Sequence, residues 1–146
     1  MATMEKMDMK NEGLQDKVLL MARLFITPLY IYSGIGKALA FGVTASRLPG
    51  GEGGLGTLLA AGAVAVELGG SAALILGLWT RWASLIMIAF TIAATLMFHQ
   101  FWAVPAAQVQ GQVFNFTKNL GLIALLAQIA VFGAGSYSLE ARSKRS

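Results

Sequence analysis

The sequence is short of residues on which soluble enzymes rely. It contains no cysteine and only one histidine, and 12% of its 146 residues are charged, whereas soluble domains have about 25% charged residues. The absence of cysteine excludes disulfides, thiolate metal ligands and dithiol redox chemistry in this chain. With 56% hydrophobic residues and a mean hydropathy of +0.66, the composition indicates a membrane protein.

The scarce polar residues also narrow the classes of function. Because His99 is the single histidine, we expect neither a metal site nor haem ligation. The net charge of +4 is concentrated towards the ends of the chain, with no basic patch interleaved with aromatics, so no nucleic-acid partner is expected. The glycine-rich segment 48–56 lacks the GK[ST] ending of a phosphate-binding loop, and we interpret it as a flexible connector.

Four apolar segments are long enough to cross a bilayer, which takes about 20 helical residues. The predicted spans are residues 18–37, 55–79, 82–99 and 113–134. The expected fold class is therefore all-α: a polytopic membrane protein with a four-transmembrane-helix bundle over residues 18–135. Outside it we expect a polar tail or short surface helix at residues 1–17 and a basic tail at residues 136–146. A short interfacial helix is expected within residues 38–47, and a glycine stop at Gly133.

Four crossings place both termini on the same side of the membrane. Eight of the eleven lysines and arginines then lie on the side of the termini, and three lie on the other side. Because positive charge marks the cytoplasmic face, we predict a multi-pass protein of the bacterial inner membrane with both termini cytoplasmic.

The second predicted span carries a single ionisable side chain, Glu67. A carboxylate in the bilayer interior is costly, so Glu67 should face other helices or a wet cavity. Small residues recur every fourth position on another face of the same helix, a pattern that lets a second helix approach closely. These helix-packing candidates are Ala65, Gly69, Ala73 and Gly77. We therefore expect this helix at the centre of the bundle or at a subunit interface.

Polar side chains elsewhere in the spans could accompany Glu67. We hypothesise a polar cluster lining a cavity open to the outer face. Its candidate residues are Glu67, Lys37, His99, Lys118, Asn119, Arg23 and Tyr30, with Thr95 on a wall. Arg23 is the alternative partner of Glu67 if that carboxylate faces the cytoplasmic end. Three interpretations stay open: a structural ion-pair network, a pocket for a quinone or another small molecule, and proton handling.

Four short motifs resemble the DoxX family of small bacterial inner-membrane proteins. They are R-L-F-I-x₅-Y-S-G-I-G-K (Arg23–Lys37), E-L-G-G-S-A-A-L-I-L-G-L-W-T-R (Glu67–Arg81), F-x-K-N-L-G-L-I (Phe116–Ile123) and G-x-G-x-Y-S-L-E (Gly133–Glu140). The resemblance implies a four-helix subunit that is often associated with redox systems, including a terminal quinol oxidase. It implies no agreed catalytic residues, and the lack of cysteine separates the chain from related four-helix thiol oxidoreductases.

From these features we predict an accessory, non-catalytic subunit of a redox or quinone-linked membrane complex. The expected partners are membrane lipids and either a larger membrane protein complex or further copies of the chain. We expect no intrinsic cofactor, and a quinone or a lipid is the candidate ligand. The alternatives are a small proton-coupled transporter, with a helix broken at the glycines around Glu67, and a structural scaffold.

Overall fold

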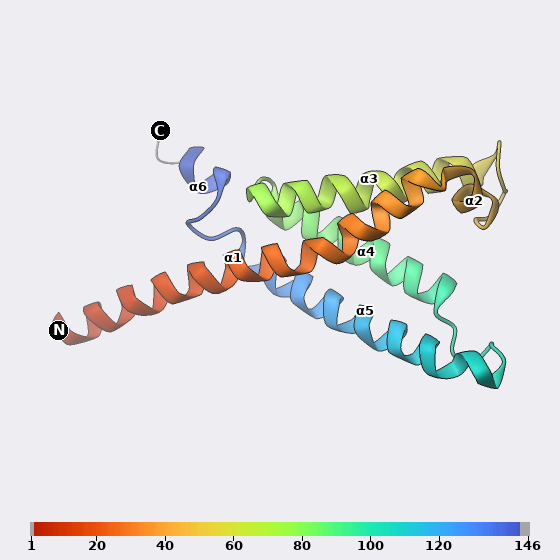
Figure 1. The fold of residues 1–146 in the computed structure, drawn as a ribbon. Helices are drawn as coiled ribbons and strands as arrows, with labels where there is room; N and C mark the ends of the chain where they lie inside the picture. Colours follow the sequence, from red (N-terminus) through yellow and green to blue (C-terminus); the bar gives the residue numbers. More distant parts are fainter. Residues whose placement is uncertain (1, 144–146) are drawn as a thin grey trace.

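The computed structural model describes residues 2–143, and all regular structure within them is helical. The helices are α1 (Ala2–Leu39), α2 (Phe41–Ser46), α3 (Leu55–Leu76), α4 (Thr80–Phe98), α5 (Ala106–Phe132) and α6 (Leu139–Ser143) (Figure 1). Four of them, α1, α3, α4 and α5, are long and apolar enough to cross a membrane. The predicted all-α fold with four membrane-spanning helices is thus confirmed.

The first helix begins much earlier than the predicted span. α1 starts at Ala2 rather than near Val18, and its apolar portion, Asn11–Leu39, forms the candidate span. The N-terminal segment contains no proline and consists mostly of good helix formers, so the helix continues into it. Pro28 lies within α1 and faces outwards, and the helix continues on both sides of it.

Glycine and proline set the other helix boundaries. α3 ends at Leu76, before the predicted Trp79, because Gly77 adopts the left-handed conformation with φ of 65°. α5 begins at Ala106, directly after Pro105, so most of the segment between the third and fourth predicted spans is helical. Its end at Gly133, where φ is 83°, confirms the predicted glycine stop. The short helix predicted within residues 38–47 is present as α2.

The bundle is built from two helix pairs. α1 packs most extensively against α3, and α4 packs against α5, while α3–α4 contacts join the pairs. The shared core contains Ile26, Tyr30, Leu74, Met87 and Leu126. In Figure 1 the α4–α5 pair diverges from the α1–α3 pair towards the end of the bundle that carries α2.

A glycine sets the distance between α1 and α3. A Cβ atom built on Gly34 would lie 2.8 Å from Leu68 Cδ2 and 3.2 Å from Glu67 Cβ. Only a residue without a side chain allows the helices to approach this closely. The close approach brings the Glu67 side chain against α1.

Candidate functional site

The Glu67 carboxylate lies at the α1–α3 interface and is bonded to α1. Lys37 Nζ donates to both carboxylate oxygens, at 2.8 and 2.9 Å, and Ser33 Oγ donates to Oε1 at 3.0 Å. The Glu67 side chain is 4% exposed and the Lys37 side chain 30%. Three hydrogen bonds and an opposite charge therefore stabilise an acid that would be costly to bury alone.

The face of α1 that carries this lysine also carries other polar side chains, and this polar stripe is turned inwards. Arg23, Thr27 and Tyr30 are all buried. Tyr30 Oη lies 2.7 Å from Thr91 Oγ1 on α4, so the stripe joins α1 to the second helix pair as well as to α3.

Buried hydroxyl groups link α4 to α5. Asn119 Nδ2 donates to Thr95 Oγ1 at 2.9 Å. The hydroxyls of Thr91 and Thr95 each donate to the carbonyl four residues earlier, which satisfies them inside the helix. Together with Tyr30, these residues form a polar ladder across α1, α4 and α5.

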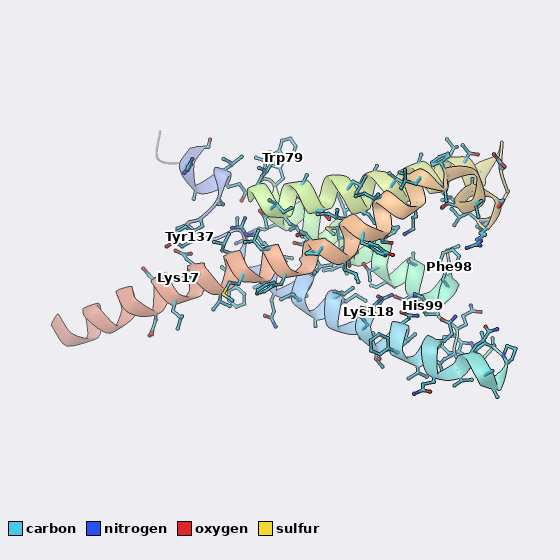
Figure 2. The ribbon with its side chains drawn as sticks, in the orientation of Figure 1. Lys17, Trp79, Phe98, His99, Lys118 and Tyr137 are labelled. Atoms are coloured by element: carbon cyan, nitrogen blue, oxygen red, sulfur yellow. The ribbon has the colours of Figure 1, made fainter. Side chains whose placement is uncertain are left out.

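The remaining candidates bond to residues other than Glu67. His99 Nδ1 lies 2.9 Å from Gln112 Oε1, and Lys118 Nζ donates to Asn115 Oδ1 at 3.3 Å on its own helix. In Figure 2, His99 and Lys118 lie beside the diverging ends of α4 and α5. The structure thus divides the seven candidates among several groups, and of the three basic partners considered for Glu67 it is Lys37 that pairs with it.

Arg23 has a different set of partners at the opposite end of the bundle. Its side chain is fully buried, and Nη1 donates to the carbonyl of Leu74 at 3.0 Å, while Nη2 donates to the carbonyl of Tyr137 at 2.6 Å. Leu74 belongs to the last turn of α3, where carbonyls lack helical partners. Arg23 therefore joins α1, the end of α3 and the segment after α5.

That segment, residues 133–143, folds back against the bundle, and we call it the C-terminal clasp. Glu140 Oε1 accepts a hydrogen bond from the Thr80 backbone amide at 2.8 Å, at the first residue of α4. An acidic group is favourable there because helix N-termini carry partial positive charge. Asp16 Oδ1 accepts from the Ser136 amide at 3.0 Å. The sequence predicts a basic tail here and not the clasp, because most bonds of the clasp end on backbone groups. The G-x-G-x-Y-S-L-E motif was its one available signal.

The predicted packing residues on α3 have different environments, and Ala73 is half-buried against the hydrophobic core. Ala65 and Gly69 are exposed, and Gly69 has no atom within 4 Å of a built Cβ. Gly77 instead ends the helix and is buried against Arg23 and Ser138. Beside the exposed residues is an apolar groove of about 310 Å³ between α3 and α4, and Trp79, Trp82 and Met87 are among its lining residues.

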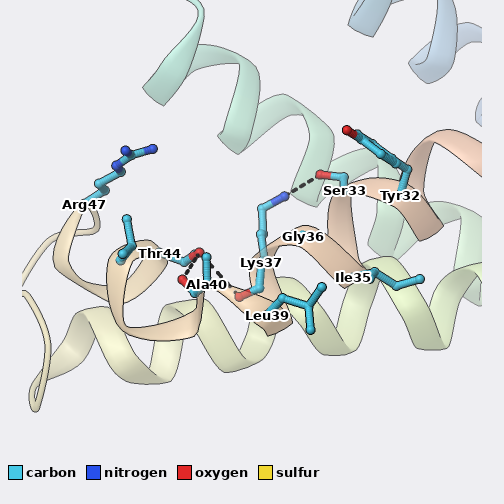
Figure 3. Close-up of a pocket in the computed structure, with 10 residues that line it drawn as sticks. Tyr32, Ser33, Ile35, Gly36, Lys37, Leu39, Ala40, Thr44 and Arg47 are labelled. Atoms are coloured by element: carbon cyan, nitrogen blue, oxygen red, sulfur yellow. Dashed lines mark hydrogen bonds between the residues drawn. The ribbon is translucent and has the colours of Figure 1, made fainter.

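A second cavity, of about 560 Å³, lies at the end of α1 and along α2 (Figure 3). Its lining includes Tyr32, Lys37, Val43, Thr44 and Arg47. Glu67 does not line it, because Lys37 and Ser33 stand between that carboxylate and the cavity side of α1. Among the described residues no group of three or more His, Cys, Asp or Glu side chains could hold a metal ion.

These features define a small polytopic membrane protein whose polar side chains bond its helices to one another. Comparison with known proteins identifies the family: residues 18–100 match the DoxX family model, and the chain belongs to the DoxX family. It is 26% identical to the inner membrane protein YphA of Escherichia coli K12 over 125 residues, which are 86% of this chain and 89% of that protein. It is 28% identical to the inner membrane protein YqjF of the same organism over 127 residues, 87% of this chain and 92% of that protein. No solved structure matches the chain. The chain is thus a multi-pass protein of the bacterial inner membrane.

Proposed function

We propose that the protein is an accessory, non-catalytic subunit of a redox or quinone-linked complex in the inner membrane. The family resemblance supports the redox association. The sequence contains no cysteine and no metal or flavin motif, so in this proposal the electrons pass through a partner and its cofactors.

The observation that carries the subunit proposal is the open face between α3 and α4. Ala65 and Gly69 have little or no side chain, so the backbone of α3 is barely covered at this face. Trp82 and Ile86 of α4 border the same face. Small residues at this spacing let the backbones of two membrane helices come close. The van der Waals packing that results is one of the forces that drive helix association in lipid. We propose that a helix of the larger partner lies on this face.

A quinone would be held at the same interface in this proposal. The α3–α4 groove is lined almost entirely by apolar side chains, which suits an isoprenoid tail, and the partner would supply donors for the headgroup carbonyls. The Glu67 carboxylate already has three hydrogen bonds from Lys37 and Ser33. Its role here is to hold α1 against α3.

The transporter alternative predicts a helix that is broken near Glu67. α3 is instead continuous from Leu55 to Leu76, through Gly62, Gly69 and Gly70, and gives that alternative no support. The scaffold alternative shares the fold with the subunit proposal and differs from it in its partners, so an experiment on partners separates them.

The test is purification in mild detergent, with mass spectrometry of co-purifying proteins and quantification of extracted quinone. Gly69→Ile fills the α3–α4 face, and Gly121→Ile on α5 is the matched control because it too has no atom near a built Cβ. We expect a reproducible larger partner and bound quinone in the natural protein and in Gly121→Ile, and the loss of both in Gly69→Ile. A natural protein without partner or quinone, or a Gly69→Ile variant that keeps both, would refute the proposal.

A further inference from the structure

The cavity beside α2 combines cationic and apolar lining groups. Arg47, just after α2, and Lys37, near the end of α1, supply the positive charge. Figure 3 shows the side chains of Tyr32, Lys37 and Arg47 projecting to the same side of the α1–α2 segment. No acidic residue is among the described residues that line the cavity.

The two cations differ in how far their charge is compensated. Lys37 forms an ion pair with Glu67 and donates its three protons to Glu67 and Ser33. The Arg47 guanidinium has neither an ion pair nor a hydrogen bond to any residue that the structure describes. The nearby acid Glu52 lies against Gly42 on α2 instead, within 2.8 Å of a built Cβ. Arg47 is thus the uncompensated positive charge of this cavity.

The apolar walls distinguish this cavity from a site for a soluble anion. Ile35, Leu39 and Val43 line it and are themselves exposed. Its lining residues belong to the end of α1 and to α2, in the segment that connects two helices long and apolar enough to span a membrane, α1 and α3. Arginine near a membrane end commonly reaches the headgroup region. A cation above an apolar wall at this level matches an amphiphile with an anionic head and a hydrocarbon tail.

We propose that this cavity binds an anionic phospholipid, with the headgroup phosphate on the Arg47 guanidinium and an acyl chain along Leu39 and Val43. Guanidinium pairs with phosphate through two parallel hydrogen bonds, which an uncompensated arginine can offer in full. The site is separate from the α3–α4 face and does not depend on a protein partner.

The test is native mass spectrometry of the full chain in detergent, titrated separately with phosphatidylglycerol, phosphatidylcholine and inorganic phosphate. A single uncompensated arginine near the surface favours the anionic lipid about fivefold. We expect this preference in the natural protein, its loss in Arg47→Gln and a reduced preference in Arg47→Lys, which keeps the charge but not the two parallel hydrogen bonds. Arg142→Gln is the matched control, since Arg142 lies in α6 at the other end of the bundle (Figure 1). Val43→Trp, which fills the cavity, should weaken binding of both lipids.

Three results would overturn the proposal. They are equal binding of the two phospholipids, a preference that survives Arg47→Gln, and inorganic phosphate that competes with the anionic lipid at equal concentration. Arg47 makes no side-chain bond to any residue that the structure describes, so we expect its substitution to leave the bundle intact, and a folded Arg47→Gln variant can be compared directly. These measurements use the isolated chain, so their outcome is independent of whether a redox partner is found.

Discussion

Removal of Lys37 should destabilise the protein far more than removal of its partner. In Lys37→Met the Glu67 carboxylate, 4% exposed, would keep only the hydrogen bond from Ser33. Leaving one charge of a buried pair without its partner costs about 3–5 kcal/mol of the free energy of unfolding. In Glu67→Gln the remaining ammonium belongs to a side chain that is 30% exposed. It can turn towards water, and we expect a loss of about 1–2 kcal/mol.

The double variant tests whether these costs arise from one interaction. Lys37→Met with Glu67→Gln leaves no buried charge, so its cost should fall below the sum of the single variants by at least about 1 kcal/mol. The control cycle combines Glu67→Gln with Lys118→Met. Because Lys118 bonds Asn115 on its own helix, those costs should add to within about 0.5 kcal/mol.

The assay is reversible unfolding in mixed micelles, followed by tryptophan fluorescence from the chain's three tryptophans. Each variant gives a free energy of unfolding, and the two cycles give two coupling energies. Additive costs for Lys37 and Glu67, or a larger loss in Glu67→Gln than in Lys37→Met, would show that the pair does not stabilise the α1–α3 interface. Coupling between Glu67 and Lys118 would place the carboxylate elsewhere.

Three further variants test the clasp and the polar ladder by the same unfolding assay. Gly77→Ala should lower the free energy of unfolding by about 1–3 kcal/mol, because φ is 65° and the added Cβ would lie 2.5 Å from Arg23 Nη1. The control, Gly121→Ala, should stabilise α5 or leave its stability unchanged. Arg23→Lys keeps the charge but cannot replace the planar guanidinium that donates to two carbonyls, so the free energy of unfolding should fall by about 1–3 kcal/mol. An unchanged stability would show that these two hydrogen bonds are not the reason for an arginine here. Thr95→Val leaves the buried Asn119 amide without its acceptor and should cost about 0.6–1.7 kcal/mol, with a cost near zero meaning that another acceptor takes its place.

The fold could be predicted from the sequence because hydropathy and length determine the number of crossings. The errors lie at the helix ends. The tail before residue 18 is polar but rich in helix formers, and hydropathy cannot tell a polar helix from a polar coil. Pro105 is a signal for the start of α5, but the polar glutamines that follow it keep residues 106–112 out of the span that hydropathy predicts.

The partners of the polar side chains could be predicted only in part. Glu67 had to be bonded, but Arg23, Lys37 and Lys118 were all cations at plausible depths. Glu67 pairs with Lys37 because α1 and α3 approach closely at Gly34, and no pattern in either span predicts this approach. The clasp was even harder to predict from the sequence. Arg23 binds backbone carbonyl oxygens there, and because every residue has one, no residue type marks the partner.

The Lys37–Glu67 pair and the hydrogen bonds of Arg23 explain why the short family motifs are spread along the chain. Arg23 and Lys37 begin and end the first motif, and Glu67 and Gly77 lie in the second. The first motif therefore contacts the second at two levels: Lys37 bonds Glu67, and Arg23 lies against Gly77. The last motif reaches the same place through Tyr137, whose carbonyl accepts from Arg23.

This arrangement separates the surfaces that hold the bundle together from those that remain free to bind other molecules. The charged side chains Glu67, Lys37 and Arg23 form their bonds with residues of this chain. None of these three residues lines the α3–α4 groove. In the other cavity Lys37 is a paired lining residue, whereas Arg47 makes no side-chain bond to a residue that the structure describes. A variant at Gly69 or Arg47 should therefore change binding without unfolding the protein. A variant at Lys37 or Arg23 should lower stability first, and any loss of binding in it should follow the loss of fold.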